Sequence, residues 1–83
     1  MRLRADVSVA DTDYGQVLLD ERTGHYWQLN PTGVVVVRAL LDGADENAAV
    51  AALTSAYEVG EAQARQDVSA LVEGLRGAGL VTA

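Results

Sequence analysis

The chain has 83 residues, of which 49% are hydrophobic, so it can bury one small core. A chain of this length hides only roughly 60% of the surface that its unfolded form exposes, which predicts a single domain over residues 1–83. The net charge is −6, with six arginines and no lysine, and this balance argues against nucleic acid as a partner because phosphate binding needs clustered basic side chains. Cysteine is absent, which excludes disulfides and thiolate metal sites.

The N-terminal residues lack the apolar core of a signal peptide. No apolar run approaches the roughly 20 residues that cross a membrane. We therefore expect a cytoplasmic protein with no membrane partner.

Three strand-like segments open the chain, at residues 7–9, 16–19 and 25–29. The intervening turns end in Gly15 and Gly24, and glycine tolerates the positive φ that a hairpin reversal often requires. This pattern predicts a three-stranded antiparallel sheet. With so few strands, the last one is expected to keep an unpaired edge unless something covers it.

The next segment, residues 31–43, is ambiguous because four consecutive valines favour a strand. Asn30 suits an N-cap, Pro31 suits the first helical position and Gly43 suits a stop, so we predict a helix. Further helices are predicted over residues 46–57 and 61–76, the latter from an apolar spacing of i, i+3, i+4, i+7. After it, Leu80 and Val81 are expected to fold back onto the core.

The order of strand, strand, strand, helix, helix, helix predicts an α+β fold with the helices on one face of the sheet. The segment from Gly24 to Pro31 contains half of the four aromatic residues, Tyr26 and Trp27, and turns from extended backbone into helix. Such a concentration without a catalytic group indicates a binding protein.

Strand alternation places His25, Trp27 and Leu29 on one face and Tyr26 and Gln28 on the other. The face of Leu29 is expected to be core. Trp27 fits core packing better than groove lining, and Tyr26 fits either role equally.

On the third helix, Leu71 and Leu75 are expected to face the core, and Val68 and Val72 to lie toward the flank that could meet a ligand. Arg65, Ser69 and Arg76 occupy the same flank, where a solvated polar face is the more ordinary role and either arginine could pair with a carboxylate of the ligand. Residues of the strand and of the third helix that could face a ligand form the candidate binding set: His25, Tyr26, Trp27, Gln28, Leu29, Arg65, Val68, Ser69, Val72 and Arg76.

No catalytic constellation is visible, so we expect no enzyme activity, no metal and no cofactor. His25 is the only histidine and has no partner at metal-ligand spacing. Ser8, Ser55 and Ser69 lie in ordinary strand or helix contexts without a glycine-flanked elbow. The acidic pairs in the chain are typical of turns and helix starts.

Several short motifs, in this order and spacing, resemble the PqqD-like family of peptide chaperones. They are residues 24–30, Leu-Leu-Asp-Gly at 40–43, Tyr57, Asp67-Val68 and Gly-Leu-Val at 79–81. The resemblance covers nearly the whole chain and is greatest to the stand-alone members of lasso peptide biosynthesis.

The resemblance implies a winged helix-turn-helix fold that recognises the leader of a ribosomally made precursor peptide. In that family the leader adds as an antiparallel strand beside the third strand, here residues 25–29, against the third helix, here residues 61–76. Implied partners are the leader region of the precursor and a separate leader peptidase of the transglutaminase-like cysteine protease type, with a cyclase as a further candidate.

Two other functions remain open from the sequence. An acyl-carrier-like protein would be small and acidic too, but Asp67, Ser69 and Leu71 lie mid-helix with Val68 interrupting the attachment motif. A winged-helix DNA-binding protein would use the third helix, where Glu61, Asp67 and Glu73 outnumber the two arginines.

Overall fold

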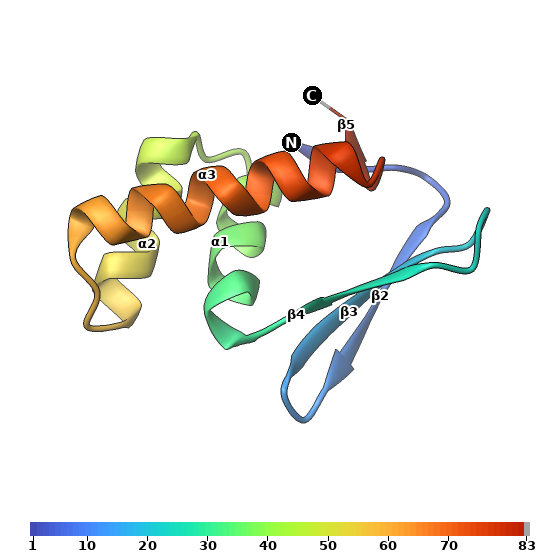
Figure 1. Cartoon of the computed structure of the whole chain (residues 1–83), viewed down its shortest axis with the longest axis horizontal. Coiled ribbons are helices and arrows are strands. Elements are labelled where there is room, and N and C mark those ends of the chain that lie inside the picture. Colours follow the sequence, from blue (N-terminus) through green and yellow to red (C-terminus); the bar gives the residue numbers. More distant parts are fainter. Residues whose placement is uncertain (83) are drawn as a thin grey trace.

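The structure is a computed structural model that describes residues 1–82 (Figure 1). Its elements are β1 (Arg2–Leu3), β2 (Val7–Thr12), β3 (Gly15–Asp20), β4 (Tyr26–Leu29), α1 (Pro31–Leu41), α2 (Glu46–Ala56), α3 (Glu61–Gly77) and β5 (Val81–Thr82). The predicted α+β fold is confirmed, with three antiparallel strands followed by three helices in the winged helix-turn-helix arrangement. Within residues 1–82, no helix is long and apolar enough to cross a membrane.

The main sheet has the order β2-β3-β4, and both pairings are antiparallel. Gly15 and Gly24 have positive φ angles of 148° and 77°, as their turns predicted. At Gly15 a side chain is also excluded, because a Cβ there would overlap the backbone of Leu29. The β2–β3 turn therefore lies close against the end of β4.

A second, two-stranded sheet joins the two ends of the described chain and was not predicted. Leu3 of β1 pairs with Val81 of β5, and the two strands lie side by side near the chain ends in Figure 1. Leu80 and Val81 are buried, so their predicted return to the core is confirmed.

The valine-rich segment is a helix, as its boundary residues predicted. The Asn30 side chain accepts a hydrogen bond from the Gly33 amide at 2.9 Å, and Pro31 is the first residue of α1. Val36, Val37 and Leu40 are buried, so packing on several sides overrides the β preference of valine.

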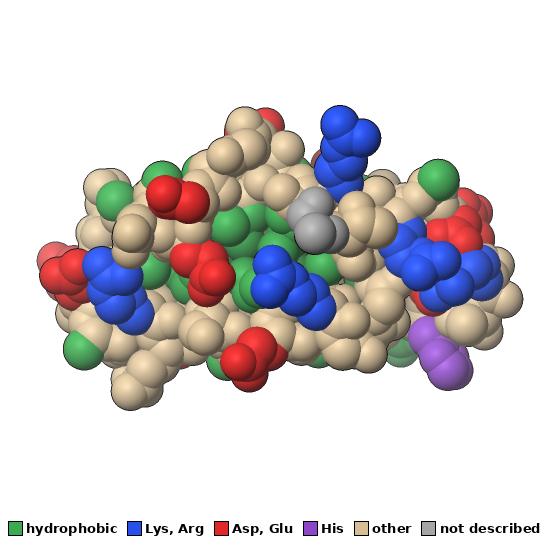
Figure 2. All heavy atoms as spheres, turned by 90° about the horizontal axis from the view of Figure 1, so that it is seen from above, with side chains coloured by type: hydrophobic (Ala, Val, Ile, Leu, Met, Phe, Trp, Pro, Cys, Tyr) green, Lys and Arg blue, Asp and Glu red, His purple; other side chains and the backbone are tan. Residues whose placement is uncertain are grey.

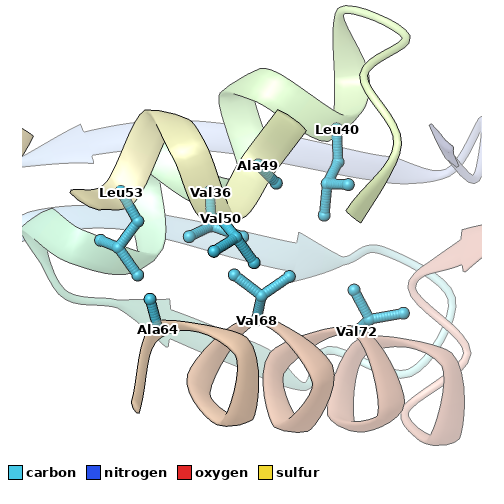
Figure 3. Packing of buried hydrophobic residues seen from close by; sticks show 8 residues of the cluster. All are labelled: Val36, Leu40, Ala49, Val50, Leu53, Ala64, Val68 and Val72. Atoms are coloured by element: carbon cyan, nitrogen blue, oxygen red, sulfur yellow. The ribbon is translucent and has the colours of Figure 1, made fainter. Parts of the chain in front are cut away.

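Two clusters of buried side chains form the core, and α3 contributes to both. The first lies among the three helices and is shown in Figure 3: Val36, Leu40, Ala49, Val50, Leu53, Ala64, Val68 and Val72. The second joins the sheet to α1, α3 and β5: Leu18, Leu29, Val37, Leu75, Leu80 and Val81. α3 thus holds the sheet and the other helices in one arrangement.

One charged side chain is buried in the part of the chain that the structure describes. Asp20, 4% exposed, accepts hydrogen bonds from the Arg22 backbone at 3.0 Å and from the Arg22 guanidinium at 3.1 and 3.3 Å. Arg22 also pairs with Asp6 at 3.0 Å. These bonds tie the β3–β4 turn to the segment before β2, and sequence analysis did not find them.

We expect the Asp20–Arg22 pair to make stability depend on pH. Hydrogen bonding to Arg22 holds the pKa of Asp20 below its ordinary value, so below about pH 4 the unfolded chain takes up a proton at this carboxyl more readily than the folded chain does. The stabilisation is therefore complete above about pH 4 and is lost as the pH falls through the lower folded pKa. Urea denaturation of wild type and Asp20→Asn from pH 7 to pH 2.5 measures it: the stability difference should shrink in acid, and a constant difference would contradict the assignment.

Candidate functional site

The outer edge of β4 has no strand partner among residues 1–82. β4 pairs only with β3, in a register that opposes Trp27 to Leu18 and Leu29 to Gln16. The Asp20 amide donates to the His25 carbonyl oxygen at 2.9 Å, which fixes the alternation of the ladder. Main-chain groups of residues 25, 27 and 29 therefore face β3, and those of Tyr26 and Gln28 face outward. The free edge presents two N–H and two C=O groups.

A groove of about 600 Å³ lies between β4 and α3. Its walls come from both elements, its floor from α1, α2 and the end of β4, and its rim from the β2–β3 turn. The lining residues are Tyr14, Trp27, Gln28, Leu29, Asn30, Thr32, Gly33, Val36, Leu53, Asp67, Ala70 and Leu71. A groove of this size, directly beside an open strand edge, suits an extended peptide.

The floor of the groove is apolar and its rim is polar. Leu29, Val36 and Leu53 are buried, whereas Tyr14 at the rim is 75% exposed. Asp67 is the charged residue among the lining side chains, and its carboxylate accepts a hydrogen bond from Gln63 at 2.9 Å. Such a lining favours apolar side chains below and polar groups at the mouth.

Trp27 packs against the core and also lines the groove, so it combines the core-packing and groove-lining roles that the sequence left open. Its indole lies against Gly74 of α3, where an added Cβ would be 2.8 Å from the ring carbon Cη2. The same side chain lines a second cleft of about 390 Å³, formed by Asp20, Arg22, Thr23, His25, Tyr26, Trp27, Ala78 and Leu80. Trp27 thus separates two neighbouring clefts.

Four of the five predicted strand residues lie where alternation placed them, whereas His25, which was placed on the face of Leu29, is exposed and precedes the first residue of β4. Leu29 is buried and Trp27 is half-buried, whereas Tyr26 is 71% exposed and Gln28 is exposed. Trp27, Gln28 and Leu29 line the groove, and His25 and Tyr26 line the second cleft. All five therefore border one of the two clefts.

The expected orientation of α3 is confirmed for Leu75, which is 0% exposed, and was wrong for the two valines. Val68 and Val72, placed on the ligand side, are 0% and 3% exposed, and in Figure 3 they point from α3 towards Val36, Val50 and Leu40. Leu71, placed in the core, is half-buried: it packs against both core clusters and also lines the groove. Residues 68 and 71 lie only about 60° apart around the helix axis, and both are apolar, so spacing alone does not decide which one faces the core.

The three polar candidates on α3 lie outside the groove lining. Arg65 donates to Asn47 of α2 at 2.7 Å and pairs with Glu61 at 3.0 Å, which directs it towards α2. Arg76 borders a separate cleft of about 220 Å³ near Met1. Ser69 is exposed and lines none of these clefts. Their part in peptide binding stays a prediction that this geometry does not favour.

Several groove residues were missed by sequence reasoning: Tyr14, Asn30, Thr32, Gly33, Val36, Leu53, Asp67, Ala70 and Leu71. The helix cap at Asn30 could have indicated the first residues of α1, because it places them directly beside the end of β4. The others depend on tertiary packing. Nothing local marks Leu53 of α2 or Tyr14 as neighbours of β4.

Charges are interspersed on the face shown in Figure 2, where red acidic side chains lie beside blue arginines and no continuous basic surface forms. Within residues 1–82, no cluster of three or more His, Asp or Glu side chains could hold a metal ion.

Comparisons with known proteins give a matching family and similar solved structures. The model of coenzyme PQQ synthesis protein D (PqqD) matches residues 15–81, which include β3, β4 and all three helices. The chain is similar to the solved structure of a lasso peptide synthetase B1 complexed with the leader peptide, with 49% identity over 99% of this chain and 96% of that one and a TM-score of 0.90. It is also similar to TbiB1 in complex with the TbiA(beta) leader peptide, with 26% identity over 96% and 93% of the chains and a TM-score of 0.84. No curated protein matches significantly.

We expect Gly74→Ala to displace the Trp27 indole, because the new Cβ would lie closer to the ring than van der Waals contact allows. Overpacking of this kind costs about 1 to 3 kcal/mol. Since Trp27 is the only tryptophan, its fluorescence emission reports the displacement directly.

Gly77→Ala is the matched control, because nothing lies within 4 Å of a Cβ there and both glycines belong to α3. The emission maximum should move to longer wavelength in Gly74→Ala and stay at the wild-type value in Gly77→Ala, and chemical denaturation should show the lower stability for Gly74→Ala. Identical spectra for both variants would disprove the close contact.

Proposed function

This chain belongs to the PqqD family, and from that premise we propose that it binds the leader segment of a ribosomally synthesised precursor peptide. Two similar solved structures are complexes with leader peptides, and one of these relatives is 49% identical over nearly the whole chain. The observation that carries the proposal is the vacant edge of β4 beside an apolar groove.

The proposed binding mode is strand addition. The leader lies antiparallel beside β4 and exchanges main-chain hydrogen bonds with Tyr26 and Gln28, whose N–H and C=O groups face away from β3. Its side chains on the helix side enter the groove between β4 and α3. Of the predicted contact residues, Trp27, Gln28 and Leu29 meet this path, whereas Val68 and Val72 act from the core by holding α3 in place.

Apolar side chains of the leader are expected to decide affinity. Four main-chain hydrogen bonds contribute about 0.5 to 1.5 kcal/mol each, and ordering each leader residue costs about 1 to 2 kcal/mol, so backbone pairing alone binds weakly. Each apolar side chain that the groove buries adds about 1.5 to 3 kcal/mol. The buried floor of Leu29, Val36 and Leu53 provides the surface for such anchors.

We assign this protein a non-catalytic role in delivering the precursor, in the cytoplasm where the precursor is synthesised. It would hold the leader while a separate leader peptidase, of the transglutaminase-like cysteine protease type, and a cyclase act on the precursor. The apolar and amide side chains of the groove lining support the holding role, because they can retain a peptide by packing and hydrogen bonding.

Titration with the leader peptide of the 49% identical relative tests the proposal. We call this peptide the reference leader. Trp27 lines the groove, so its fluorescence should change saturably, with a dissociation constant in the micromolar range. A proline scan of the leader should then weaken binding most at two positions, two residues apart, whose N–H groups face Tyr26 and Gln28. Each lost hydrogen bond corresponds to about a 2- to 13-fold loss of affinity.

An alanine scan of the same leader positions is the matched control, because alanine removes the side chain and keeps the N–H group. No saturable binding at tens of micromolar would refute leader recognition. Equal effects of proline and alanine at every position would refute strand addition and leave leader recognition standing.

A further inference from the structure

Beyond leader recognition itself, we infer that the second cleft beside Trp27 is a second subsite for the leader. It takes one uncharged, apolar side chain about four residues C-terminal to the side chain that occupies the groove. The inference rests on the proposed function, because it needs the leader to lie antiparallel along β4.

The two clefts form one path along β4 and α3. Leu29 of β4 and Asp67 of α3 line the groove, His25 and Ala78 line the second cleft, and Trp27 lines both. β4 and α3 therefore run in opposite directions along this path. A leader antiparallel to β4 runs parallel to α3, so it meets the groove first and the second cleft afterwards.

The length of the path sets the spacing between the two subsites. Ala70 lines the groove and Ala78 lines the second cleft, and eight residues of helix rise roughly 12 Å. An extended chain rises about 3.3 Å per residue, so roughly 12 Å corresponds to about four leader residues. Because strand side chains alternate with a period of 2, residues four apart point to the same side and can fill both clefts.

The chemistry of the second cleft favours an apolar, uncharged side chain. One wall is apolar and consists of Ala78, the Trp27 indole and the nearly buried Leu80, while the remaining lining residues have polar groups: Asp20, Arg22, Thr23, His25 and Tyr26. The one arginine that borders the cleft, Arg22, is already paired with Asp20 and with Asp6. Its charge is thus balanced within the protein, and a leader carboxylate would gain little from it.

Disulfide trapping tests the inference cleanly because the chain contains no cysteine. Two single-cysteine variants, Ala70→Cys in the groove and Ala78→Cys in the second cleft, place a thiol at exposed small residues on the same side of the path. Each is mixed with reference leaders that carry one cysteine at successive positions, with oxidised glutathione as the oxidant. A disulfide forms only when the Cβ atoms approach to about 3.5 to 4.5 Å, so mass spectrometry of the products gives the leader position at each subsite.

The leader position trapped by Ala78→Cys should lie about four residues C-terminal to the one trapped by Ala70→Cys. If Ala70→Cys traps the leader while Ala78→Cys and a second probe in the same cleft, Thr23→Cys, trap none, the second subsite is refuted and leader recognition stands. A reversed order of the two positions refutes the inference and the antiparallel mode together. Failure of the unmodified protein to bind the reference leader refutes leader recognition instead.

Discussion

Within residues 1–82 the outer edge of β4 has no strand partner, which leaves the outward N–H and C=O groups of Tyr26 and Gln28 to water. Exposed edges invite pairing with other chains, and natural sheets commonly protect them. Here the edge is short and lies beside a groove, which restricts pairing to a chain that also fits the groove. Main-chain bonding can then supply register, and side-chain burial can supply selectivity.

The neighbouring elements keep this edge open and shape the groove. Asn30 starts α1 directly after β4, so the strand cannot continue and its end is fixed against the helix. Gly15 lets the β2–β3 turn approach the backbone of Leu29, and Gly74 lets the Trp27 indole lie against α3. Larger side chains at Gly15 and Gly74 would push the β2–β3 turn away from Leu29 and the Trp27 indole away from α3, which would change the shape of the groove.

Much of this architecture is predictable from local sequence, and the rest depends on packing. The boundary residues Asn30 and Pro31 correctly predicted a helix in spite of the valines that follow. Strand alternation correctly separated the buried Leu29 from the exposed Tyr26.

The orientation of α3 was not predictable, because Val68 and Leu71 are equally apolar and only their partners distinguish them. Val68 packs among the other helices, whereas Leu71 reaches the groove. The second cleft was missed for a related reason, since its walls come from the β3–β4 turn and from the end of α3, which are far apart in the sequence.

Amide hydrogen exchange by NMR, with and without saturating reference leader, tests the open edge of β4 most directly. In the free protein the amides of Tyr26 and Gln28 should exchange fast and those of Trp27 and Leu29 slowly, and the leader should protect Tyr26 and Gln28. Protection of Tyr26 and Gln28 in the free protein, or unchanged fast exchange at both in the saturated complex, would contradict strand addition at β4.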